Sequence, residues 1–375
     1  MGKIILDVFD SDFKRVGAIN KYSSLIYTEK FNGVGTFQLQ ASKENMDVIE
    51  NGRYILIEQE ILAEILTLET DSSVGIVSLS GKFIEHILDS RVILEMESFS
   101  DTSTNICRSL VNSNFINPTS LDRTIDKIKL STNTDYIPVN SVISKQISQG
   151  SVEGKIQSIL SPINCGYSLV PTITAYVDGS NISDLNFRIL EGLDRTINNI
   201  SGNNHVEFSF ELLNILESQY TFDKTVYKTD FIVLGEGEGT AKKRYISESG
   251  VSGFDRKELS VEDSGIVATD ANGNPISDAA YLQLLKTAGE ERMEDYKIFE
   301  SFEVTINPDS SLFTYEEDYS LGDIVTIEDI ITGLKYDVVV NEVQKSNGKN
   351  GFYIDIVLGY ERPLTIQVLK KEGDL

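Results

Sequence analysis

Few of the residues that build enzyme and metal sites occur in this sequence. Its 375 residues include no tryptophan, two cysteines and two histidines. Cys107 and Cys165 cannot form the disulfide framework of so long a chain, and no zinc-ligand spacing occurs. His86 and His205 lie far apart, outside any HExxH motif, and no Gly-x-Ser-x-Gly elbow exists. We predict buried thiols, structural histidines, no catalytic residue, no metal site and no cofactor, although sequence order leaves a Ser–His–Asp triad open.

Positive charge is also scarce. The chain has 33 Lys and Arg against 58 Asp and Glu, which gives a net charge of −25. Such a chain should not hold nucleic acid by neutralising phosphates, so we predict no specific nucleic-acid binding. The segment 303–334 is the extreme case, with eight acidic residues and no Lys or Arg. It is either a solvated acidic face or a surface that must repel a polyanion.

Long hydrophobic runs are missing. The apolar run at Ile4–Leu6 ends at Asp7, which is too short for the core of a signal peptide. The longest uncharged run, 156–177, contains Pro162 and Pro171, so a membrane span there would leave polar groups unsatisfied. We predict that this run is a helix end, a turn and a strand. We therefore expect no membrane insertion, and synthesis in a reducing bacterial cytoplasm.

A chain of this length predicts about two or three domains. Alternation at Thr36–Gln40 predicts a half-buried strand, and Asn-Gly pairs between two β-rich runs predict a hairpin around residue 349. A helix should begin after the N-cap Ser277. Its expected buried stripe is Leu282, Leu285, Gly289, Met293 and Tyr296. The predicted regions are 1–95 (β), 96–205 (α+β insert with a return strand), 206–245 with 300–368 (second β region) and 246–299 (helical insert).

Two motifs resemble ligand sites but are better explained as ordinary backbone features. Gly235–Gly239 alternates glycine with glutamate and lacks the Gly-Lys-Ser/Thr ending of a phosphate loop. A strand end that needs close backbone approach is the favoured interpretation. Asp270, Asn272 and Asn274 have the first spacing of a calcium loop, but Pro275 replaces its glycine. An exposed turn is therefore expected there.

Five segments, in this order and spacing, resemble the baseplate hub proteins of tailed phages known as the Siphovirus ReqiPepy-type tail proteins. The resemblance extends from about residue 20 to 360 and is weakest over 96–185. The segments that carry it are Tyr22–Tyr27, Phe31–Leu39, Gly81–Val92, Gly235–Gly239 and Asp318–Val325.

The resemblance implies a mainly β fold of two small β-barrels with inserted α+β domains. It also implies a homotrimeric ring that adapts a hexameric tail tube, or its initiator proteins, to a threefold central spike or tip protein. The location would be the virion tail baseplate or a phage-like bacteriocin particle. Acidic residues lining the lumen would repel DNA. The candidate lining residues are Glu236, Glu238, Asp318, Asp323, Glu328 and Asp329.

Two other functions stay open at this point. A tail-tip cell-wall hydrolase would need a lytic site, and the sequence shows neither a metal motif nor a Cys–His motif. A receptor- or carbohydrate-binding tail protein would use exposed aromatic residues, and tyrosine is common here, with 16 residues. We predict a structural protein that is not an enzyme.

Overall fold

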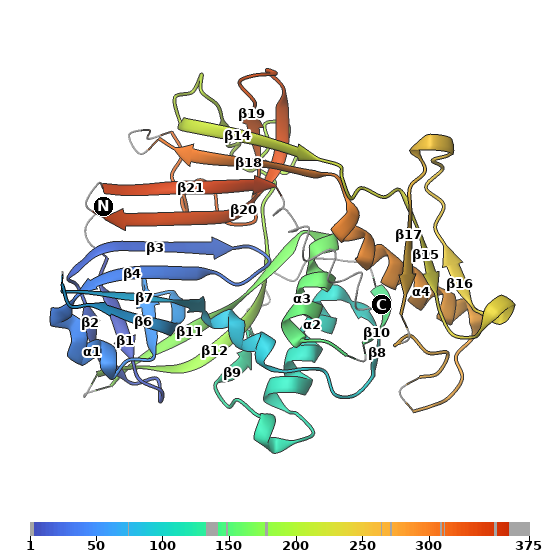
Figure 1. Ribbon diagram of the computed structural model, residues 1–375, viewed down its shortest axis with the longest axis horizontal. Helices are drawn as coiled ribbons and strands as arrows, with labels where there is room; N and C mark the ends of the chain where they lie inside the picture. Colours follow the sequence, from blue (N-terminus) through green and yellow to red (C-terminus); the bar gives the residue numbers. More distant parts are fainter. Residues whose placement is uncertain are drawn as a thin grey trace.

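The computed structural model describes residues 4–73, 75–132, 142–147, 149–176, 179–263, 265–270, 272–307, 310, 312–348 and 351–359. Antiparallel strands dominate it, and the helices lie at several places around them (Figure 1). The predicted mainly β fold is therefore confirmed. None of the described helices has the length and apolar character needed to cross a membrane.

The first β region is built around alternating strands. In the strand Thr36–Ser42, Phe37 and Leu39 are buried while Gln38 is exposed, as the sequence predicts. These inward side chains join a core that the first seven strands share. The elements are β1 (Leu6–Phe9), β2 (Arg15–Ile19), β3 (Tyr22–Lys30), β4 (Thr36–Ser42), η1 (Lys43–Asn45), α1 (Met46–Glu50), β5 (Tyr54–Ile57), β6 (Ile61–Asp71), β7 (Ile76–Phe83) and the 3₁₀ helix η2 (Ile84–Ser90).

The second β region has its own core of buried side chains. The predicted hairpin is confirmed, because its two strands pair from Val340–Leu358 to Gly348–Gly351. Residues 349–350 at its turn, and 360–368, lie outside the described residues. The elements are β13 (Glu207–Phe208), β14 (Ile215–Asp223), β18 (Phe299–Ile306), β19 (Ile324–Glu328), β20 (Lys335–Gly348) and β21 (Gly351–Gly359).

One antiparallel ladder joins the two β regions. β20 pairs with β3 from Glu342–Lys30 to Gly348–Ser24, which makes a single sheet of 13 of the described strands. Its main path runs β14-β18-β21-β20-β3-β4-β7-β6-β5-β1-β2, with β14 at the top of Figure 1. Among the described strands no ladder closes either region into a barrel, so two barrels stay a prediction.

The two β regions repeat one strand order. β14, β18, β21, β20 and β19 follow each other as β3, β4, β7, β6 and β5 do. The irregularities repeat too. A bulge at Ser23 in β3 matches one at Leu216 in β14, and a bulge at Leu66 in β6 matches one at Asn341 in β20. Since bulges fix register, the repeat aligns residue by residue.

The alignment is consistent around all the ladders. It pairs Phe37 of β4 with Phe302 of β18, and Tyr27 of β3 with Tyr220 of β14. Phe37 is opposite Gly81, and Phe302 is opposite Leu358. The ladders that contain the bulges at Leu66 and Asn341 give the same result independently: they also align Gly81 of β7 with Leu358 of β21. One chain therefore contains two copies of the same sheet motif.

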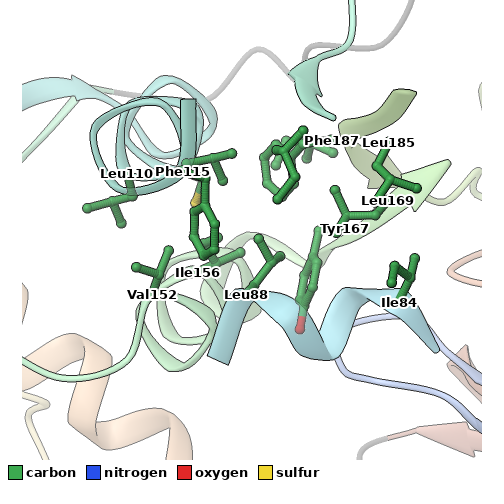
Figure 2. Packing of buried hydrophobic residues seen from close by; sticks show 14 of the residues in the cluster. Ile84, Leu88, Leu110, Phe115, Val152, Ile156, Tyr167, Leu169, Leu185 and Phe187 are labelled. Atoms are coloured by element: carbon green, nitrogen blue, oxygen red, sulfur yellow. The ribbon is translucent and has the colours of Figure 1, made fainter. Parts of the chain in front are cut away.

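The first insert packs directly on the first β region. Leu88 of η2 shares a core with Leu110, Phe115 and Ile156 of the insert (Figure 2). Thr102 and Ser151 cap the two helices through their side-chain oxygens. The predicted helix end, turn and strand in the uncharged run are confirmed as α3, η5 and β11. The elements are β8 (Glu97–Thr102), α2 (Ser103–Val111), η3 (Asn112–Ile116), η4 (Leu121–Arg123), β9 (Ile128–Leu130), β10 (Val142–Ile147), α3 (Val152–Leu160), η5 (Ser161–Ile163), β11 (Cys165–Tyr176) and β12 (Gly179–Glu191).

The second insert is larger than predicted. β15 lies in the stretch 206–245 predicted for the second β region, but it pairs with β16 and with β17, and it packs on α4. The insert therefore includes β15 instead of starting at residue 246. It lies at the right of Figure 1. Its elements are β15 (Asp230–Leu234), η6 (Gly239–Ala241), β16 (Arg244–Ile246), η7 (Gly253–Asp255), β17 (Glu258–Glu262), α4 (Asp278–Met293) and η8 (Glu294–Tyr296).

The N-cap Ser277 is confirmed, since its side chain accepts the Ala280 N–H. The predicted stripe on α4 is partly wrong. Leu285, Gly289 and Tyr296 are buried as predicted, but Leu282 is exposed, and Tyr281 is buried in its place. The phenol of Tyr281 needs the space above the end of β15, where a Cβ on Gly235 would lie 2.4 Å from its oxygen. Gly235 therefore lets a side chain approach the backbone at this strand end, where the Glu236 N–H donates to the Tyr281 hydroxyl at 2.8 Å.

Candidate functional site

The outward face of the joined sheet is polar and hollowed. Across β14, β18, β21, β20 and β3, side chains alternate between the core and a shallow groove of about 730 Å³. The groove crosses the joint between the two β regions. We call this surface the polar sheet face. Its outward side chains in the groove are Thr28, Glu217, Gln219, Glu303, Thr305, Glu342, Gln344, Asp355 and Val357.

Carboxylates dominate the charge of the polar sheet face. Glu217, Glu303, Glu342 and Asp355 lie in the groove. The cation beside them, Lys30, contacts Glu342 at 2.9 Å. The remaining carboxylates give the groove a negative potential that disfavours a phosphate backbone.

A buried charge cluster lies behind this face at the joint. Lys345 of β20 is 3% exposed, and its Nζ lies 2.6 Å from Glu316, 2.9 Å from Glu58 and 3.3 Å from Glu29. Burial alone would lower the pKa of Lys345, but these carboxylates raise it, so the ammonium stays charged. The cluster links β3, the β5–β6 turn, β20 and the loop before β19. It therefore contacts both β regions where the β20–β3 ladder joins them.

The predicted lining residues do not form one group. Glu236 and Glu238 are exposed in the turn after β15, on the second insert, whereas Asp318 and Glu328 are half-buried on the second β region.

Asp323 and Asp329 are 3% and 6% exposed, so neither can line a lumen. Asp323 accepts the Leu193 N–H at 2.7 Å and pairs with Arg195 at 2.6 Å. Asp329 accepts bonds from the backbone and hydroxyl of Thr332, which lower its pKa. Both carboxylates hold the chain's own loops.

A buried carboxyl group joins the first β region to its insert. One oxygen of Glu85 accepts the Leu169 N–H at 2.9 Å, and among the described residues the other has no hydrogen-bond partner. Burial raises the pKa of Glu85 to about 7, against 4.5 in an unfolded chain. The folded chain then binds more protons between these values, so its stability falls as pH rises from about 4.5 to 7.

Glu85→Gln should therefore stabilise the chain at pH 8, by up to about 3 kcal/mol, and flatten this pH dependence. Thermal unfolding followed by circular dichroism at pH 5 and pH 8 measures both effects. The exposed Glu50→Gln serves as the control and should change neither. An unchanged pH dependence in Glu85→Gln would show that another group dominates the titration.

Comparison with protein families matches residues 5–360 to the family described as Siphovirus ReqiPepy6 Gp37-like protein. The chain belongs to this family. The match covers nearly the whole chain, and it confirms the resemblance found in the sequence. This membership makes the chain a phage tail protein, located in the virion tail.

Solved structures show the same fold at low sequence identity. The 43 kDa tail protein of prophage MuSo2 from Shewanella oneidensis has a TM-score of 0.53 at 13% identity, covering 95% of this chain and 98% of that one. Prophage tail protein gp18 from Listeria monocytogenes has a TM-score of 0.53 at 13% identity, covering 100% and 99%. The tail protein from Neisseria meningitidis gives 0.50 at 12%, covering 96% and 97%. No curated protein sequence matches the chain.

Of the residues considered for chemistry, His86, Cys107 and Cys165 have structural surroundings, and His205 is exposed. His86 lies 2.6 Å from Glu64, which also binds Arg53 at 2.9 Å. Cys107 and Cys165 are buried, and burial raises the pKa of both thiols. Among the described residues, no three His, Cys, Asp or Glu side chains gather as metal ligands would.

Sequence analysis singled out Glu303, as part of the acidic segment 303–334, but it missed Glu217, Glu342 and Asp355 of the polar sheet face. Glu217, Glu303, Glu342 and Asp355 come from four strands, and the ladders alone bring them together. The available signal was strand alternation, which places a charged residue between buried ones in Phe302-Glu303-Val304. Sequence alone could not show that these strands lie side by side.

Proposed function

We propose that this chain is the structural, non-enzymatic hub of a phage or phage-like tail baseplate. Three copies would form a ring that adapts a hexameric tail tube, or its initiator proteins, to a threefold central spike or tip protein. The register-matched repeat of the two β regions supports this proposal most directly. Three chains with two equivalent sheets each present six similar surfaces to a sixfold partner.

The two inserts explain how the same ring would meet a threefold partner. The insert of the first β region packs α2 and α3 over a three-stranded sheet, whereas that of the second packs α4 on β15–β17. These units differ in both topology and sequence, so each occurs once in every chain. Any surface that they form has threefold symmetry in a trimer.

The polar sheet face supports an acidic channel wall. A continuous sheet that spans both β regions gives each chain one polar surface with a shallow groove, and its carboxylates would keep a passing DNA backbone from adhering. In this proposal the wall is formed by Glu217, Glu303, Glu342 and Asp355. The exposed or half-buried Glu236, Glu238, Asp318 and Glu328 remain the other candidate set.

An averaged image of the assembled tail, with this chain labelled, tests the proposal. We expect three copies in the baseplate around the tail axis, with the polar sheet face toward the channel. A ring with that face outward would contradict the acidic wall while leaving the hub in place. A label away from the baseplate, or copies in a number other than three, would refute the hub.

A further inference from the structure

Two strand edges of the joined sheet have no neighbour among the described residues. β14 pairs only with β18. β6 pairs with β5 through residues 61–64, but residues 66–71 pair only with β7 and are exposed. Long open edges are places where another strand can add, and proteins usually protect them.

The internal repeat shows what covers these edges. In the aligned repeat, β6 corresponds to β20 and β14 corresponds to β3. Within the chain β20 and β3 pair with each other and form the joint of the two β regions. β6 and β14 are therefore the two halves of the same joint: β14 ends the main path of the sheet, and residues 66–71 of β6 extend beyond its pairing with β5. A second copy of this chain carries the complementary half of each.

The alignment also fixes the register. The in-chain pair Val343–Glu29 corresponds to Leu68 of one copy and Phe222 of the next. Both side chains point to the core side of the sheet, yet Leu68 is 43% exposed and Phe222 is 48% exposed. The pairs that follow from the alignment are Thr67–Asp223, Leu68–Phe222, Glu69–Thr221, Thr70–Tyr220 and Asp71–Gln219.

Charge supports this register over its neighbours. Each acidic residue lies opposite a neutral one, as in Glu69 with Thr221. A slip of two residues in one direction places Glu69 opposite Asp223, and a slip in the other places Asp71 opposite Glu217. Like charges directly opposite each other destabilise a strand pair. The apolar pair and the carboxylate spacing therefore select the same alignment.

We propose that residues 66–71 of β6 pair antiparallel with β14 of a second copy, with Leu68 against Phe222. The contact is head-to-tail, so it closes a ring if the rotation per copy allows it. The inference rests on the proposed hub only for the number of copies in that ring. Outside the ring the half-exposed Leu68 and Phe222 remain in water; inside it each covers the other.

Cysteine cross-linking of the full chain tests the contact. The double variant Leu68→Cys/Phe222→Cys, treated with a short bis-maleimide, should give covalent species of two and three copies on a denaturing gel. Either single variant should give none, because residue 68 meets residue 222 of the next copy and not its own counterpart. Wild type is the blank, since Cys107 and Cys165 are buried.

A second measurement separates this inference from the proposed hub. Leu68→Lys or Phe222→Lys should reduce the trimer fraction in native mass spectra at least tenfold, while circular dichroism stays unchanged. Phe254→Lys replaces a fully exposed aromatic on the second insert and should leave trimers intact. Trimers without the cross-link would overturn the inference alone. Monomers throughout would overturn both, and cross-linked ladders beyond three copies would support the joint while refuting the trimer.

Discussion

Replacing Lys345 with methionine is expected to lower the free energy of unfolding by about 3–5 kcal/mol, because it leaves the mostly buried carboxylates of Glu29 and Glu58 without their cation. The side chains of Glu29 and Glu58 lie mostly buried beside the ammonium, and the exposed Glu316 completes its surroundings. The aromatic rings of Tyr27 and Tyr315 also face the ammonium. Methionine keeps most of the side-chain volume, so the loss reports the charge and not a cavity.

Urea unfolding followed by far-ultraviolet circular dichroism measures this loss, since the chain has no tryptophan to follow. Lys335→Met is the matched control. It lies on the same strand and pairs with Glu207 at 2.6 Å, but it is exposed. Its loss should be about 1 kcal/mol or less. Equal losses in the two variants would mean that the buried cluster does not hold the joint.

Local features of this fold could be predicted from the sequence because their causes are local. Ser277 caps α4 through a bond to a residue three positions away, and the glycines around residue 349 set a hairpin between adjacent strands. The buried ion pair of Asp323 depends on Arg195, which lies 128 residues earlier in the chain. No pattern around Asp323 shows this partner, so its negative charge was interpreted as surface.

The internal repeat was hidden for a related reason. Its two copies are interrupted by different inserts, so no constant spacing relates them. Aligned positions keep the side of the sheet that the side chain faces more often than they keep the residue type. Tyr27 and Phe37 recur as Tyr220 and Phe302, but Leu68 corresponds to Val343 and Thr70 to Lys345. A sheet requires only that inward positions fill the core, which many residues can do. Register and bulges, which become visible with the ladders, were needed to recognise the repeat.

Phe31→Ala should cost about 3–5 kcal/mol, because this side chain fills the place where three parts of the molecule meet. Phe31 is 2% exposed and follows β3. Its N–H donates to the Asn341 carbonyl of β20 at 2.9 Å, and its carbonyl accepts the Tyr167 N–H of β11 at 3.3 Å. A Cβ on Gly322 would lie 2.2 Å from the Phe31 ring.

Removing the ring leaves these backbone hydrogen bonds in place but opens a cavity. The surrounding strands cannot move in to fill it, because its walls belong to three separate units: β3, β11 and the loop before β19. Urea unfolding should therefore show a lower midpoint, and hydrogen exchange should increase in β3, β11 and the loop before β19 together. Phe254→Ala, which removes a ring from a fully exposed position, should change stability by about 0.5 kcal/mol or less. Faster exchange confined to one of the three units would contradict a shared joint at Phe31. Simultaneous loosening of all three would show that one side chain fixes the first insert against both halves of the repeat, so the proposed ring would be built from rigid subunits.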